Sequence, residues 1–213
     1  MNKLDILGYV VILSILLLCV YIYFQNEDTQ LSCIVSTVNG NKYCVRERSK
    51  MKEAANLLAS TTDKLVKLVN YVVKKYPNDS NVKRLKQKFR PDKIKEILPT
   101  SYYTAYSENK GEKIAFCLDV KKGSTNNLID EHTLTFVAIH ELSHVMSLSV
   151  GHKSEFWNNF RFLLRNAKEA GIHEPIDYRK KPTTYCSLKI TDSPHFEKQL
   201  NETDKNKQMV IFM

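Results

Sequence analysis

The strongest constraint on the fold is a pair of histidines set four residues apart in a long apolar segment, His140-Glu-Leu-Ser-His144. The apolar stretches 135–139 and 145–150 flank the pair, which predicts a buried helix over residues 130–150. Histidines at positions i and i+4 project from one face of a helix, close enough to bind the same metal ion. Burying such polar groups without partners or a metal is costly. We therefore expect the chain to fold around this helix.

Glu141 gives the motif a chemical purpose beyond metal binding. Its carboxylate lies next to the first histidine, where it can reach a water molecule on the metal. Zinc lowers the pKa of such a water to about 7, and a glutamate can take its proton as the water attacks a carbonyl. These residue types at this spacing are typical of zinc proteases. The motif thus predicts a hydrolase in which Glu141 is the general base.

A catalytic zinc usually has a third protein ligand and one open position. His152 is our candidate, because Gly151 can adopt a left-handed conformation that ends the helix and turns the chain back. Glu155 and Glu169, on a helix predicted over residues 153–170, remain open as alternative ligands. The other histidines of the chain are expected at the surface or in loops: His132, His173 and His195.

The segment after the motif carries a family resemblance. Gly151-His152-x-x-x-Phe156-Trp157, following His-Glu-Leu-Ser-His, resembles the WLM and SprT-like zinc metallopeptidases. More closely, residues 104–194 are similar to membrane-anchored WLM-type proteins of large DNA viruses of eukaryotes. The phrases that carry this likeness are Ala105-Tyr-Ser-Glu-Asn-Lys-Gly-Glu-Lys113, His140–Trp157, and Lys181-Pro-Thr-Thr-Tyr-Cys-Ser187 with Ile190-Thr-Asp-Ser-Pro194.

The resemblance implies a minimal zincin fold with Zn²⁺ held by His140, His144 and His152 and with Glu141 as general base. One departure is the spacing, because seven residues separate His144 from His152, more than is expected in cellular WLM proteins. Zincins generally bind substrate as an extra strand along a sheet edge beside the metal helix. Residues 113–120 are our candidate for that edge, and an ordinary core strand is the alternative.

An oxyanion stabiliser is also expected, since negative charge develops on the attacked carbonyl. Tyr185, in the segment after the last predicted helix, is the first candidate, and Tyr178 is the second. The aromatic pair Phe156 and Trp157 is expected to pack between helices rather than to contact substrate.

The remaining periodicities predict an α+β fold: a minimal zincin-like domain with a small sheet, the active-site helix and flanking helices. A long helix is expected over 49–76, followed by a short helix whose outer face is basic. Strands are expected over 102–107 and 113–120, around the turn signal Asn109-Lys110-Gly111. After Gly171 the sequence becomes polar and irregular.

An uncharged apolar run covers residues 6–24. About 20 apolar residues match the thickness of a bilayer, and the run is longer than the apolar part of a signal peptide. We therefore predict a transmembrane helix. Lys3 precedes the run and Glu27 and Asp28 follow it, which predicts a cytosolic N-terminus and a lumenal or external domain. In a viral protein the membrane would be a host endomembrane or the virion membrane.

Cysteine usage agrees with an oxidising compartment. Outside the apolar run lie Cys33, Cys44, Cys117 and Cys186, enough for two disulfides. Cys33 and Cys44 flank Asn39-Gly40, a hairpin signal, so a bridge between them is expected; free buried thiols are the alternative. The predicted division is a short tail at 1–5, the transmembrane helix at 6–24, a linker and hairpin at 25–48, the WLM-like peptidase domain at 49–194 and a C-terminal tail at 195–213.

The predicted function is that of a membrane-tethered zinc endopeptidase, with a protein or peptide substrate as its partner. The net charge of +9, from 32 basic and 23 acidic residues, favours anionic partners without naming one. A non-catalytic membrane or virion protein with a structural metal site is one alternative. A nucleic-acid-binding module using the basic face 83–95 is another, and it ranks lower. Glu141 favours the enzyme, because structural zinc sites are closed by four ligands.

Overall fold

The computed structural model describes residues 3–25, 30–124 and 127–196. Most of the predicted C-terminal tail, from residue 197 onward, lies outside these residues. The described part contains helices together with short strands in small sheets, so the predicted α+β fold class is confirmed.

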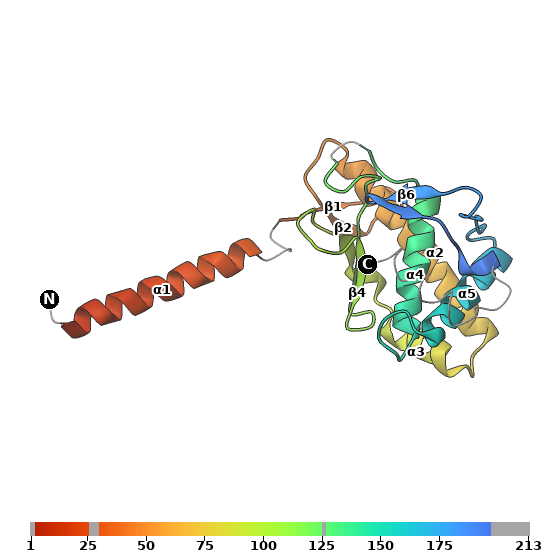
Figure 1. Ribbon diagram of the computed structural model, residues 1–213, viewed down its shortest axis with the longest axis horizontal. Coiled ribbons are helices and arrows are strands. Elements are labelled where there is room, and N and C mark those ends of the chain that lie inside the picture. The colour runs from red at the N-terminus through yellow and green to blue at the C-terminus, as the bar shows by residue number, and fades with distance from the viewer. Residues whose placement is uncertain (1–2, 26–29, 125–126, 197–213) are drawn as a thin grey trace.

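The first helix, α1 (Lys3–Gln25), stands apart from the remaining elements (Figure 1). Its described side chains, from Ile6 to Ile22, are exposed. Within the part of the chain that the structure describes, no helix has both the length and the apolarity needed to cross a bilayer. The predictions of a transmembrane helix over 6–24 and of a single-pass membrane localisation are therefore wrong.

The helices of the main body follow the predicted segments to within a few residues. They are α2 (Met51–Lys75), α3 (Ser80–Lys88), α4 (Glu131–Met146) and α5 (Ser154–Glu169), with short 3-10 helices at Pro91–Lys93 (η2) and Pro194–Phe196 (η3). α4 packs against α2, α3 and α5, and the three surround it in Figure 1. Almost every residue of α4 is buried, which explains why its sequence is apolar on all sides.

A three-stranded sheet lies beside α4. Its strand order is β3 (Ile94–Glu96), β5 (Lys113–Phe116), β4 (Ala105–Glu108), with β3 parallel and β4 antiparallel to β5. β5 therefore occupies the centre, and the prediction that 113–120 forms the exposed edge is wrong. The sequence pattern gave no sign of the three-residue strand β3, which covers one side of β5. The edge strand that packs against α4 is β4.

The predicted N-terminal hairpin is present. It consists of β1 (Ser32–Val35) and β2 (Lys42–Val45), which pair in antiparallel register with Cys33 opposite Cys44. These two cysteines form a disulfide, so the expected local bridge is confirmed and the alternative of free thiols is excluded for this pair.

The irregular C-terminal segment contains a hairpin that the sequence analysis did not predict. β6 (Thr183–Tyr185) and β7 (Leu188–Ile190) are joined by Cys186 and Ser187, whose φ angles of 49° and 69° are left-handed. Such turns usually contain Asn or Gly, which explains why this one carried no recognisable signal. A second disulfide joins Cys186 to Cys117, just after β5.

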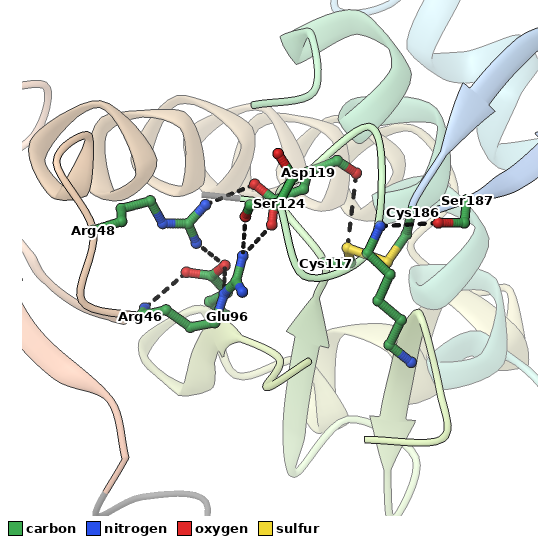
Figure 2. A network of polar contacts seen from close by, with 9 residues as sticks. Arg46, Arg48, Glu96, Cys117, Asp119, Ser124, Cys186 and Ser187 are labelled. Carbon is green, nitrogen blue, oxygen red and sulfur yellow. Dashed lines mark hydrogen bonds and ion pairs between the residues drawn. A yellow bond between two sulfur atoms is a disulfide. The ribbon is translucent and has the colours of Figure 1, made fainter. Parts of the chain in front are cut away.

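A buried network of four charges connects the N-terminal hairpin to the sheet (Figure 2). Arg46, just after β2, donates through Nε to Glu96 at 2.8 Å and contacts Asp119. Arg48 donates to Asp119 at 2.7 Å and contacts Glu96. Arg46 also donates to the backbone carbonyl of Ser124 at 3.1 Å. Two guanidinium groups thus neutralise two carboxylates, which allows all four charges to be taken out of water.

Candidate metal centre

The three histidines expected to bind the metal lie together. His140 and His144 come from α4, and His152 comes from the loop that follows it. One ring nitrogen from each histidine lies within 4.8 Å of the others, and the Nε2 atoms of His140 and His152 are 3.0 Å apart. A tetrahedral zinc with Zn–N bonds of 2.0–2.1 Å sets its ligand nitrogens about 3.3 Å apart. The cluster could therefore hold a metal ion after small side-chain adjustments.

Burial keeps these imidazoles in the form that binds metals. It lowers the pKa of His144 to about 3 and that of His152 to about 4, and it lowers the pKa of His140 well below its usual value. Each ring is therefore neutral at physiological pH, and neutral imidazole is the ligating form.

Two side chains and one backbone group fix the end of α4. Ser147 donates to the carbonyl oxygen of Ser143 through its backbone N–H at 3.1 Å and through its hydroxyl at 2.7 Å. Arg84, from α3, donates to the carbonyl oxygen of Met146 at 2.7 Å. The last turn of the helix therefore has partners for carbonyl groups that a helix end would otherwise leave unsatisfied.

The loop that carries His152 is also fixed. Glu155, from α5, accepts hydrogen bonds from the backbone N–H groups of Leu148 and Ser149, each at 2.9 Å, and Lys110 donates to the carbonyl oxygen of Ser149. Gly151 is left-handed with φ of 75°, as predicted, but it lies within this loop rather than at the helix end. His152 therefore reaches α4 from a segment anchored by the β4–β5 turn and by α5.

The alternative ligands lie elsewhere. Glu155 holds the loop backbone as described, and Glu169, at the far end of α5, pairs with Lys75. Among the described residues, the potential metal-binding group contains neither carboxylate. The remaining histidines are also separate from it: His132 stacks on buried His173 with ring centroids 4.2 Å apart, and His195 lies in η3.

Phe156 forms an apolar base beneath the three histidines. Its ring centroid is 4.3 Å from that of His144, 4.6 Å from that of His152 and 4.7 Å from that of His140. Phe156 and its neighbour Trp157 are buried, which confirms that they pack inside the protein. The contact of one ring with all three ligand candidates was not predicted, because it depends on how α5 lies across α4.

Glu141 follows His140 in α4 and is buried, and burial raises its pKa to about 8. The hydroxyl of Tyr185, also buried, donates to the carbonyl oxygen of Thr104 at 3.1 Å. Burial raises the pKa of Tyr185, and the charge of Glu141 contributes to this shift, so the two side chains are electrostatically coupled. Tyr178 packs against Phe136 with ring centroids 4.8 Å apart.

A cleft with a volume of about 970 Å³ opens over the histidines. His140, His144 and His152 line it, as do Ala105 to Glu108, the residues of β4. Neither Tyr185 nor Tyr178 is among the described residues that line it. The cluster therefore has one side open to molecules from outside, as a catalytic rather than a structural zinc site requires.

Comparisons with known proteins give similarity without an assigned activity. No family model matches the chain. An uncharacterized protein, R325, of Acanthamoeba polyphaga mimivirus is 28% identical over 86% of this chain and 96% of its own length. Another, 136R of invertebrate iridescent virus 6, is 33% identical over 33% of this chain and 39% of its own length.

Among solved structures, Wss1 from Saccharomyces cerevisiae is similar at 20% identity, with a TM-score of 0.43 over 58% of this chain and 86% of that protein. A mutant of the same protein gives a TM-score of 0.45 at 18% identity. At these values the likeness assigns neither a family nor an activity to this chain.

Proposed function

We propose that the chain is a zinc-dependent, WLM-like endopeptidase that hydrolyses peptide bonds in protein or peptide substrates. The observation that carries this proposal is the three-histidine cluster, which contains the first and last residues of the His140-Glu141-x-x-His144 motif and lines a cleft that the edge strand β4 also lines. A zinc ion bound there would supply a water of lowered pKa and would polarise a carbonyl group. The viral relative R325 extends over nearly the same length but has no assigned activity.

Each residue near the cluster has a distinct proposed role. Glu141 accepts the proton of the attacking water and then delivers it to the nitrogen of the leaving amine, so that no charge accumulates there. His140, His144 and His152 hold the metal, and the buried ring of Phe156 keeps bulk water from the rear of the site. Burial raises the pKa of the Glu141 carboxyl, and the positive charge of a zinc held by the histidines would lower it again, which favours the ionised carboxylate that a base requires.

The edge strand supplies the binding mode. β4 pairs with β5 on one side only, so its outer backbone groups can pair with an extended peptide that lies in the cleft. Tyr185 remains a proposed oxyanion stabiliser. Because Tyr185 is buried outside the cleft lining and its hydroxyl is bonded to Thr104, this role requires the whole side chain to move toward the substrate, and Tyr185→Phe tests whether it does.

The decisive experiment separates catalysis from metal binding. The full chain loaded with zinc is compared with Glu141→Gln on an unfolded protein substrate, and zinc content is measured for both. The proposal expects cleavage to fall by at least about 100-fold while zinc content stays the same. Equal cleavage by the two chains, or none by either, contradicts it; a zinc-loaded chain without activity supports a structural metal site instead.

A further inference from the structure

Large apolar side chains are unusually exposed along the metal cleft. Tyr102 is 83% exposed, Tyr103 57% and Val150 78%. All three line the cleft, and Leu148, 70% exposed, lines an adjoining hollow. Exposed apolar groups gathered in one place mark a binding surface, since a protein surface that contacts only water gains nothing from them.

Tyr102, Tyr103 and Tyr106 form an ordered array, which we call the tyrosine wall. The ring centroids of Tyr102 and Tyr103 are 5.5 Å apart in an edge-to-face arrangement, and those of Tyr103 and Tyr106 are 5.9 Å apart. Lys122 donates to the carbonyl oxygen of Tyr103 at 3.1 Å and also contacts that of Ser101. The backbone that presents the wall is therefore fixed before any ligand arrives, which lowers the entropy cost of binding.

The tyrosine wall lies along the edge strand β4 and the residues just before it. Tyr106 lies within β4, and Tyr102 and Tyr103 precede that strand, with Thr104 between. A peptide paired with the outer edge of β4 would place alternate side chains on the same face as these rings. The tyrosine wall and the three histidines line the same cleft. A peptide with one side chain bound at the wall can therefore extend its backbone past the metal centre.

We propose that the tyrosine wall is a side-chain subsite that selects peptides with an aromatic or large aliphatic residue near the bond to be cleaved. This inference rests on the proposed function and adds the substrate class. Aromatic rings bind such side chains by stacking and by burial of apolar area.

A peptide fits the wall better than a nucleic-acid strand does. Single-stranded nucleic acids also stack on tyrosines, but they need a track of available cations for their phosphates. The lysine over the ring of Tyr106 is Lys113, with Nζ 5.8 Å from the ring centroid. Lys113 is paired with Glu108 at 2.7 Å, and Lys110, which also lines the cleft, donates to the loop carbonyl of Ser149. These two lysines are therefore engaged within the protein, so the exposed rings are the main contact that the wall offers a ligand.

Binding to the full chain carrying Glu141→Gln tests the inference without cleavage. The probes are two fluorescent peptides of equal length and charge, one with a central Phe-Leu and the other with Ser-Asn, measured by fluorescence anisotropy. We expect the apolar peptide to bind about 10-fold more tightly. Tyr102→Ser with Tyr103→Ser should remove that preference, while the corresponding change to Phe should keep it. Val38→Ser, at an exposed position in the β1–β2 turn, is the matched control.

The outcomes separate this inference from the proposed function. Equal binding of both peptides, or a preference unchanged in the double serine variant, overturns the inference. It is also overturned if single-stranded oligonucleotides bind more tightly than the apolar peptide and lose that binding in the serine variant. If the preference depends on the tyrosines but the zinc-loaded parent cleaves no peptide, the subsite stands and the proposed peptidase activity fails.

Discussion

Replacing Arg48 by methionine tests the buried charge network directly. The side chains of Arg48 and Glu96 are each 1% exposed and that of Asp119 is 0% exposed. Burial lowers the pKa of Arg48 and raises that of Asp119, and the attraction between the two opposes both shifts. Methionine retains much of the apolar stem but leaves two buried carboxylates that share Arg46 as their guanidinium partner in the network.

The expected cost follows from this uncompensated charge. Removing one partner of a buried ion pair destabilises a protein by about 3–5 kcal/mol, a large share of the 5–15 kcal/mol that typically separates folded from unfolded states. Adding Asp119→Asn to the variant restores the balance of charge. The double variant should therefore be less destabilised than the sum of the single variants by about 1–3 kcal/mol.

Urea unfolding measures these free energies, with the fluorescence of the single, buried Trp157 as the signal. Lys93→Met is the control, because Lys93 and Asp92 form an exposed pair at 3.9 Å; its effect should lie within about 0.5 kcal/mol. A cost below about 1 kcal/mol for Arg48→Met, or additive effects in the double variant, would refute the network as described.

Two further substitutions test the close packing of Gly111 in the β4–β5 turn and the protonation of the buried His173 ring. Gly111→Ala should destabilise the protein by at least about 1 kcal/mol more than Gly40→Ala in urea unfolding. Both glycines have positive φ, but only a Cβ added at Gly111 would meet neighbours, Lys88 O and Val145 Cγ1, each at 2.8 Å. Equal costs for the two substitutions would contradict the close approach. Burial lowers the pKa of His173 to about 3 from 6.5, so below pH 6.5 the unfolded state binds a proton that the folded state refuses, and stability falls as pH falls toward 3. His173→Gln should therefore reduce the loss of stability between pH 7 and pH 5 by about 2 kcal/mol, and an unchanged loss would show that this ring is accessible to protons.

Local sequence patterns predicted the main-body helices and the grouping of the three histidines. The periodic apolar residues of α2 and the continuous apolar sequence of α4 reflect which faces of each helix are buried. Each pattern is visible within a single segment of the sequence. The spacing of His140 and His144 fixes their common face in the same way. His152 could be proposed because Gly151 permits a turn, and the structure brings it to the other two.

Features that depend on distant parts of the chain could not be predicted. β3 has only three residues, and each pairs with a residue of β5 that lies 20 positions later, so the sequence pattern predicts an edge strand at 113–120 where the structure has a central one. Arg46 pairs with Asp119 across 73 positions, which no local pattern records. The apolar run 6–24 was interpreted from composition and length, and the structure does not support the membrane span inferred from it.

Zinc content tests the central claim most directly. The full chain is equilibrated with a defined concentration of free zinc, and bound metal per chain is measured by mass spectrometry, beside His152→Ala and the control His132→Ala. The three-histidine centre predicts one zinc in the parent and in the control, and a loss of affinity of at least about 10-fold in His152→Ala. A folded parent without zinc, or binding unchanged by His152→Ala, would contradict it.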